Sequence, residues 1–194
     1  MHVHKLISKM ANIKQYNTLF LDRDGVINKQ RPNDYVKSPD EFVFIEGVTE
    51  ALKLLSPYFK HILIVTNQRG VGRGLMTLED LTKVHTHMLQ TINASGGRID
   101  HIYFCTSTDN SNPDRKPNTG MALQAKHDFP DIDFTDSWLA GDSRSDIQFA
   151  NRVGIKAALI GNKYHEKELK DLNISVQCPN LLTFAQLIKQ EIDS

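Results

Sequence analysis

The sequence predicts an α/β protein built on a doubly wound, Rossmann-like and mostly parallel sheet with helices on both faces. Short apolar runs alternate with longer amphipathic stretches along most of the 194 residues, as strands and helices do in such folds. The short runs are almost continuously apolar, which is typical of strands buried on both faces. A composition with 40% hydrophobic and 24% charged residues suits a single globular domain.

Six strands and six helices are expected in alternation. The strands are predicted at residues 18–21, 61–66, 101–105, 137–140, 155–160 and 174–177. The helices are predicted at residues 48–56, 78–94, 118–128, 145–153, 165–172 and 181–192. Thr77 and Asp80 form a capping box before the second helix, and we expect Pro117 to open the third. Because these helices fill the intervals between the first three strands, neither interval has room for a cap domain.

We expect a flexible N-terminal extension over residues 1–15 and one domain over residues 16–194. Lysine plus arginine and aspartate plus glutamate balance at 23 each, so no global field attracts nucleic acid or an anionic membrane. No apolar run is long enough to cross a bilayer or to act as a signal peptide. Cys105 and Cys178 form no disulfide framework and fit a reducing compartment. We therefore expect a cytoplasmic monomer or homodimer that binds neither nucleic acid nor membrane.

Asp22 and Asp24 follow the first predicted strand, where ligands bind in a doubly wound sheet. Two carboxylates this close repel each other unless a divalent cation lies between them or one is protonated. The same segment resembles the beginning of a calcium loop, but Val26 and Ile27 stand where such a loop needs further oxygen ligands. An aspartate-rich turn without a function is the remaining alternative.

The second and third strands are followed by groups that suit a phosphate. Thr66 and Asn67 offer a hydroxyl and an amide, and three glycines are expected to keep the next loop open. A glycine-rich turn is the plain alternative, because the spacing matches no Walker or dinucleotide motif. Lys116, after the third strand, can neutralise both a phosphate and a carboxylate, although a lysine before a helix is also ordinary at a surface.

Asp142 ends the fourth strand, and Asp146 follows four residues later. Together these carboxylates can ligate a metal ion or orient its ligands. An aspartate in the first turn is also a common helix cap, and this alternative is strongest for Asp146. Each of the four signals is weak alone, but they fall in order at the ends of successive strands and therefore indicate one site.

These four segments resemble the motifs of the haloacid dehalogenase-like phosphatase superfamily, which are DxD, a Thr or Ser, a Lys, and GDxxxD. The resemblance implies that Asp22 is the nucleophile that forms an aspartyl-phosphate and that Asp24 is the general acid and base. It implies that Thr66 and Lys116 bind the transferring phosphoryl group. Mg²⁺ is the implied cofactor. Its implied ligands are Asp22, Asp24 through the backbone carbonyl, Asp142 and Asp146.

A narrower similarity is to the heptose-bisphosphate phosphatase and histidinol-phosphatase branch. It is carried by the segments DRDGVIN, YV before FVFIEGV, TNQRGVGRG and RKPNTGM. The implied substrate is a small phosphorylated metabolite, in the first place a sugar bisphosphate. The residues expected to border it are Asn28, Asn67, Gln68, Arg69, Arg73 and Arg115.

Two departures from this branch concern the metal and the charge of the site. Many members hold zinc with three cysteines and one histidine in the loop before the RKP segment. In this chain the loop has only Cys105, so no zinc is expected. Many members also have a lysine where this chain has Ser143, and the substitution removes a positive charge near the metal.

Three other functions remain open at this stage. Histidinol phosphate is an alternative substrate within the same branch. A capless polynucleotide 3′-phosphatase would share all four motifs but should have a basic groove, which the balanced charge does not favour. A non-catalytic binding module would be expected to have lost a motif residue, and none is lost. The eight histidines have no metal-binding spacing and are expected to be structural or at the surface.

Overall fold

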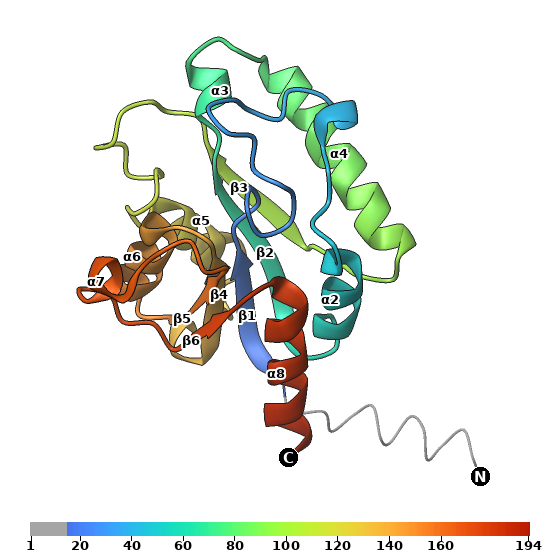
Figure 1. The fold of residues 1–194 in the computed structure, drawn as a ribbon, viewed down its shortest axis with the longest axis vertical. Coiled ribbons are helices and arrows are strands. Elements are labelled where there is room, and N and C mark those ends of the chain that lie inside the picture. Colours follow the sequence, from blue (N-terminus) through green and yellow to red (C-terminus); the bar gives the residue numbers. More distant parts are fainter. Residues whose placement is uncertain (1–14) are drawn as a thin grey trace.

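The computed structural model describes residues 15–194, which form a six-stranded sheet between two layers of helices (Figure 1). The strands are β1 (Tyr16–Leu21), β2 (Phe59–Asn67), β3 (His101–Cys105), β4 (Ser137–Gly141), β5 (Lys156–Ile160) and β6 (Val176–Cys178). Their order is β3-β2-β1-β4-β5-β6, and every neighbouring pair is parallel. The chain returns after β3 to place β4 beside β1, which creates a switch point there. The predicted doubly wound fold is confirmed.

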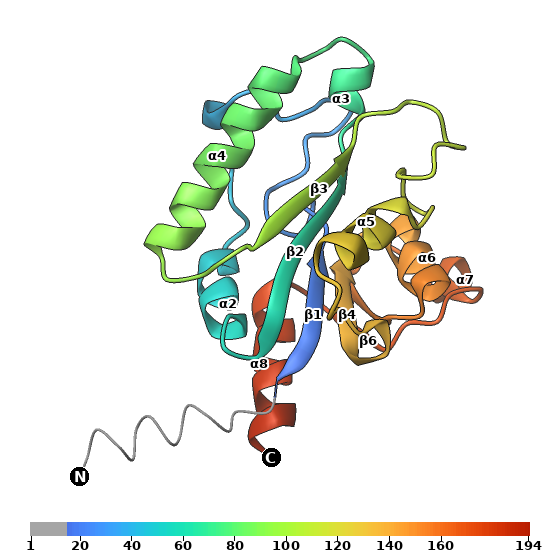
Figure 2. The same cartoon turned by 180° about the vertical axis from the view of Figure 1, so that it is seen from behind.

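The helices cover both faces of the sheet, as Figure 2 shows from behind. One face carries α2 (Val48–Leu55), α4 (Leu78–Ala94) and α8 (Leu181–Asp193). The other carries α5 (Gly120–Asp128) and α6 (Arg144–Val153). Shorter helical segments are α3 (Arg69–Gly72), α7 (Glu166–Leu169) and the 3₁₀ turns Pro39–Glu41 and Phe134–Asp136.

The strands bury both faces because successive side chains alternate in direction. Leu19 and Leu21 pack under the layer of α2, α4 and α8, whereas Phe20 between them packs under α5 and α6. Ile64 and Val65 of β2 divide in the same way. All five side chains are fully buried. A sheet held on both sides fixes the positions of its carboxyl ends, where the polar residues stand.

The start of α5 differs from the prediction. The helix begins at Gly120 rather than at residue 118, and Pro117 lies in the turn before it. The side-chain amide of Asn118 donates hydrogen bonds to the carbonyls of Asn110 and Asn112, at 3.0 and 2.9 Å. The prediction that Pro117 opens this helix was wrong, because Asn118, which was assigned to the first helical turn, instead holds the preceding loop closed.

The segment after β2 also differs, because Arg69–Gly72 form the single turn α3 instead of an open loop. A Cβ atom on Gly72 would lie 2.1 Å from the carbonyl oxygen of Thr106. This glycine therefore allows close packing against the neighbouring loop. The later helix α7 is shorter than predicted and covers Glu166–Leu169 only.

The connections between the first three strands contain only loops, the 3₁₀ turn Pro39–Glu41 and the helices α2, α3 and α4, so no inserted cap domain occurs within residues 15–194. The predicted extension lies outside the described residues except for Gln15, whose side chain donates to the carbonyl of Pro57. Among the helices of residues 15–194, none has the length and apolar character needed to cross a membrane.

Candidate active site

A cavity of about 650 Å³ opens at the carboxyl ends of β1, β2 and β4. It lies beside the switch point, where a doubly wound sheet binds its ligands. The strand ends and their neighbours contribute Asp22, Asp24, Thr66, Asn67, Arg73, Lys116, Asp142, Ser143, Ser145 and Asp146 to its lining. The segment after β1 contributes Gln30, Arg31, Pro32, Asn33, Asp34, Tyr35 and Val36. The predicted motif residues therefore share one cavity.

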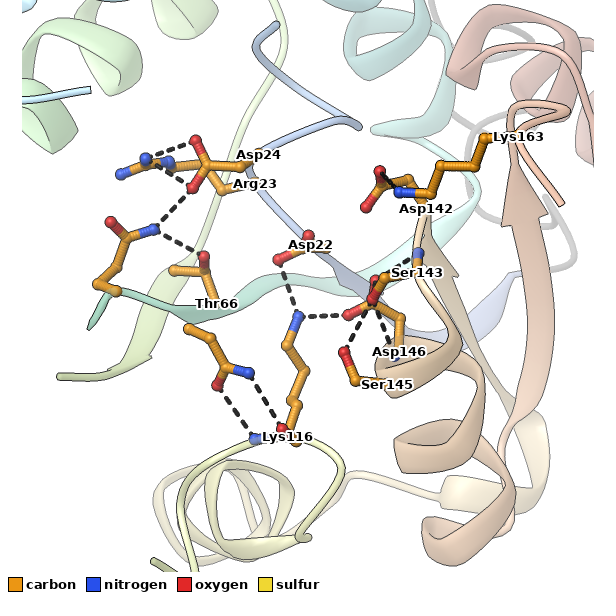
Figure 3. A network of polar contacts seen from close by, with 12 residues as sticks. Asp22, Arg23, Asp24, Thr66, Lys116, Asp142, Ser143, Ser145, Asp146 and Lys163 are labelled. Atoms are coloured by element: carbon orange, nitrogen blue, oxygen red, sulfur yellow. Dashed lines mark hydrogen bonds and ion pairs between the residues drawn. The ribbon is translucent and has the colours of Figure 1, made fainter. Parts of the chain in front are cut away.

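Lys116 lies at the centre of the polar network (Figure 3). Its Nζ donates hydrogen bonds to Oδ1 of Asp22 at 2.8 Å and to Oδ1 of Asp146 at 2.6 Å. Its side chain is 2% exposed. The side chain of Asn67 fixes the Lys116 backbone, because it donates to the carbonyl and accepts from the N–H. Asn67 therefore positions the lysine beside the carboxylate.

Three buried carboxylates form a potential metal site. Asp22, Asp142 and Asp146 each offer one oxygen, and these oxygens lie within 4.8 Å of one another. Burial, opposed by Lys116 and reinforced by the charges of Asp146 and Asp142, raises the pKa of the Asp22 carboxyl. Burial likewise raises the pKa of Asp142. Such a cluster of hard oxygen donors gains stability from a divalent cation, and Mg²⁺ fits it.

Asp146 caps α6, as one of its two predicted interpretations requires, and its other carboxylate oxygen faces the acidic cluster. Its Oδ1 meets Lys116, while its Oδ2 accepts hydrogen bonds from the backbone N–H and the hydroxyl of Ser143 at 2.9 and 2.5 Å. The bond from the Ser143 N–H belongs to the capping box of α6. Gly25 helps to close the cluster from the other side. Its φ is +91°, and a Cβ atom there would lie 2.3 Å from Oδ2 of Asp142, so a larger residue would displace that carboxylate.

Asp24 points away from Asp22 toward Arg23 (Figure 3). Both of its carboxylate oxygens accept from Nη2 of Arg23, at 2.6 and 2.7 Å. Asn28 and Gln68 add one hydrogen bond each, both at 2.9 Å. Burial favours the neutral acid, but these partners outweigh it and hold the pKa of Asp24 below its usual value. In this arrangement the Asp24 carboxylate is paired with Arg23 and is turned away from Asp22 (Figure 3).

The structure divides the six predicted substrate-binding residues into three pairs. Asn67 and Arg73 line the cavity. Asn28 and Gln68 do not line it; they are almost fully buried and hold Asp24. The structure therefore does not bring these two amides to the cavity wall.

Arg69 and Arg115 lie beside the cavity rather than in its lining. Both donate to the same oxygen, Oδ1 of Asn110, and Arg115 also donates to the carbonyl of Ser107 at 3.1 Å. A neutral amide oxygen thus holds two positive side chains side by side.

Sequence reasoning missed the contribution of residues 30–36 to the cavity. This segment is held by ion pairs from Arg31 to Glu41 at 2.8 Å and from Lys37 to Asp34 at 2.9 Å. The guanidinium of Arg73 lies 6.0 Å from the ring centroid of Tyr35. The only sequence signal for this segment was that Tyr35 belongs to the YV motif of the narrower family similarity. Arg23, which holds Asp24, stood between the two motif aspartates and carried no signal of its own.

An aspartate at the end of the central strand, a lysine bonded to it and a buried acidic cluster define a haloacid dehalogenase-like phosphatase. Residues 17–173 match the family model described as polynucleotide kinase 3 phosphatase. The chain belongs to that family and is a phosphatase.

Relatives and solved structures agree with this assignment. The chain is 38% identical over 179 residues to a D-glycero-beta-D-manno-heptose-1,7-bisphosphate 7-phosphatase of Neisseria meningitidis, covering 89% of this chain and 95% of the relative. It is 39% identical over 140 residues to the corresponding alpha enzyme of Mycobacterium bovis, covering 72% and 74%. A D,D-heptose 1,7-bisphosphate phosphatase from B. bronchiseptica, solved with magnesium and phosphate, matches with a TM-score of 0.81 at 30% identity, covering 90% and 99%.

Proposed function

We propose that this phosphatase removes one phosphate from a heptose bisphosphate, with Mg²⁺ as its cofactor and an aspartyl-phosphate as its intermediate. The choice of a bisphosphate as substrate is supported by a group of three arginines, Arg69, Arg73 and Arg115. Among residues 15–194 none of them forms an ion pair with a carboxylate. The charges of Arg69 and Arg73, after burial, help to lower the pKa of Arg115, so the three lie close enough to repel one another.

Uncompensated guanidinium groups beside a catalytic cavity favour an anionic ligand. A phosphate monoester accepts hydrogen bonds from two or more donors, and arginine presents its donors in a planar fork that matches this geometry. Lys116 and Thr66, which both line the cavity, are available for the transferring phosphate. A second phosphate on the same small substrate would neutralise the arginine group. The curated relatives named above act on heptose 1,7-bisphosphates, which carry two such groups.

The chemical step uses residues of this chain at defined positions. A carboxylate oxygen of Asp22 attacks phosphorus, and the bond from phosphorus to the sugar oxygen breaks. Asp24, once released from Arg23, takes up a proton from solvent and gives it to that sugar oxygen; it later takes a proton from the water that hydrolyses the aspartyl-phosphate. Lys116 and the Thr66 hydroxyl offset the charge on the phosphoryl oxygens. Inorganic phosphate leaves, and Asp22 is regenerated.

Asp22, Asp142 and Asp146 would hold Mg²⁺, with the backbone carbonyl of Asp24 as a further oxygen ligand. Bound there, the ion would supply positive charge for the phosphoryl oxygens and relieve the repulsion among the carboxylates. Support comes from the buried donor set and from the similar solved structure that contains magnesium and phosphate.

Two alternative substrates fit the site less well. Histidinol phosphate carries one phosphate and an ammonium group, so it would leave the arginines without an anion and add a cation near them. A polynucleotide 3′-phosphate is favoured by the description of the family model. A strand of nucleic acid needs positive charge along an extended path, whereas the cavity lining also contains Asp34 beside Arg31.

Phosphate release from a panel of substrates tests the proposal. The panel contains the alpha and beta heptose 1,7-bisphosphates, a heptose 7-phosphate, histidinol phosphate and a 3′-phosphorylated oligonucleotide, each with and without Mg²⁺. We expect kcat/KM to be highest for a bisphosphate and to require the metal. Faster turnover of the oligonucleotide or of histidinol phosphate would overturn the substrate, and metal-independent turnover would overturn the cofactor. No turnover by folded protein would favour a binding role.

A further inference from the structure

Lys163 contacts the acidic cluster from outside the four motifs. It lies in the loop after β5, and its Nζ donates to Oδ2 of Asp142 at 2.5 Å (Figure 3). The Asp142 side chain is 9% exposed and the Lys163 side chain is 43% exposed. The phosphoryl-transfer steps above make no use of this lysine, and none of the sequence motifs contains it.

The loop that carries Lys163 is attached at both ends. At its start, the N–H of Gly161 donates to the carbonyl of Cys178 at 2.7 Å, which ties the loop to β6. At its end, the hydroxyl of Tyr164 accepts from the N–H of Arg144 at the start of α6, and the Tyr164 ring packs against the core. The Lys163 ammonium lies 5.3 Å from that ring's centroid. These attachments limit the conformational entropy lost when the lysine pairs with Asp142.

The ion pair between Lys163 and Asp142 affects the charge balance of the acidic cluster. Three carboxylates meet at the metal site, and Lys116 contacts only Asp22 and Asp146. Within residues 15–194, Lys163 forms the ion pair with Asp142. Ser143, next to Asp142 in the sequence, carries no charge, so the charge that faces Asp142 comes from the loop after β5.

We propose that Lys163 is a positioning residue that sets the balance between cation and anion binding at the active site. Its ammonium opposes Mg²⁺ at Asp142 and favours a phosphate near the same carboxylate cluster. Removing it therefore has opposite effects on the two ligands: Mg²⁺ binds more tightly, and phosphate binds more weakly. The inference rests on the proposed magnesium site.

Isothermal titration calorimetry of the full chain with Mg²⁺ alone tests the first effect. We expect Lys163→Ala to bind Mg²⁺ roughly 3–10-fold more tightly than the wild type, as a unit charge removed from a partly screened site would give. Lys163→Arg keeps the charge and should stay within about 2-fold of the wild type on the same grounds. Lys167→Ala is the matched control, because it removes the same charge from an exposed position nearby on α7.

Inhibition by inorganic phosphate at saturating Mg²⁺ tests the second effect, and Lys163→Ala should raise the inhibition constant roughly 3–10-fold. Unchanged or weaker Mg²⁺ binding in Lys163→Ala, or an equal change in Lys167→Ala, would overturn the role of Lys163 alone. Absence of Mg²⁺ binding to the folded wild type would overturn the magnesium site and the inference together. The two failures are therefore distinguishable.

Discussion

The two sides of the cavity are built in different ways. The strand-end side consists of Asp22, Thr66, Lys116, Asp142 and Asp146, all of which are buried. The loop side consists of residues 30–36 and Arg73 in the lining, together with Arg69 and residues 106–115 beside it. Much of this side is half-buried or exposed. The first side is fixed by buried strands and the second by ion pairs and hydrogen bonds near the surface. We infer that the chemistry depends on the rigid side and substrate selection on the adaptable side.

The largest expected effect is on the strand-end side, at the nucleophile. Asp22→Asn should lower kcat at least roughly 10³-fold, because the amide cannot form the phosphoryl-enzyme intermediate. Circular dichroism should show that the variant remains folded, since the amide occupies the same volume as the carboxylate. Steady-state phosphate release measures the effect. Activity above about one-thousandth of wild type would contradict the role of Asp22.

The second prediction concerns Lys116, which neutralises two buried carboxylates. Lys116→Met should lower kcat by about 10²–10³-fold and the free energy of unfolding by about 3 kcal/mol, because buried charges lose their partner. Mg²⁺ should restore part of the stability, since it replaces the missing charge. Urea unfolding with and without Mg²⁺ measures this. Lys60→Met is the control, because the ion pair of Lys60 with Asp131 is exposed and should matter by less than about 1 kcal/mol.

The same contrast explains how far the sequence could predict the site. Asp22, Thr66 and Asp142 follow apolar runs, so their meeting at one sheet edge follows from the fold class. The positions of Asn28 and Gln68 did not follow, because an amide beside a strand end is equally able to face the substrate or to hold Asp24. Residues 30–36 carry no periodic pattern, and their place at the cavity depends on long-range ion pairs that sequence spacing does not encode.

A third prediction concerns His85 of helix α4, which lies next to Arg23. His85 of α4 is 7% exposed, and its Nε2 lies 3.4 Å from Nη1 of Arg23. Burial, followed by the charge of Arg23, lowers the pKa of His85 to about 4. The unfolded chain, with a histidine pKa near 6.5, therefore binds a proton at a higher pH than the folded chain does. His85 favours unfolding as the pH falls from about 6.5 to about 4.

The corresponding loss of folding free energy is about 3 kcal/mol at the acidic end of this range. Chemical unfolding at pH 7 and at pH 4.5 measures it, with His85→Gln as the variant that keeps a neutral polar side chain. The variant should lose less stability than the wild type over this range. An identical pH dependence in both proteins would show that His85 is not the titrating group.

The fourth prediction concerns the loop side. Arg115→Met should raise KM for a bisphosphate about 10–100-fold, as expected for loss of a charged hydrogen bond to phosphate. It should change kcat little, because Arg115 lies outside the lining where Asp22 acts. The matching sugar monophosphate is the control, and its KM should rise much less. Equal increases for both substrates would mean that Arg115 does not select the second phosphate.

The smallest effects are expected from two glycine-to-alanine substitutions, one on each side of the cavity. A Cβ atom on Gly141 would lie 2.3 Å from Cβ of Asp146, and a Cβ atom on Gly70 would lie 2.8 Å from Cγ of Tyr35. Gly141→Ala should therefore displace the Asp146 side chain, which bonds to Lys116, and lower both kcat and the free energy of unfolding, the latter by about 2 kcal/mol.

Gly70→Ala should move Tyr35 within the adaptable loop side, so its cost should stay near 1 kcal/mol and appear in KM rather than in kcat. Thermal unfolding together with steady-state kinetics on one bisphosphate measures both variants. Reversed behaviour, with kcat falling in Gly70→Ala and only KM rising in Gly141→Ala, would contradict the division of labour. It would imply that the loop side positions the reacting groups and that the strand ends merely bind the substrate.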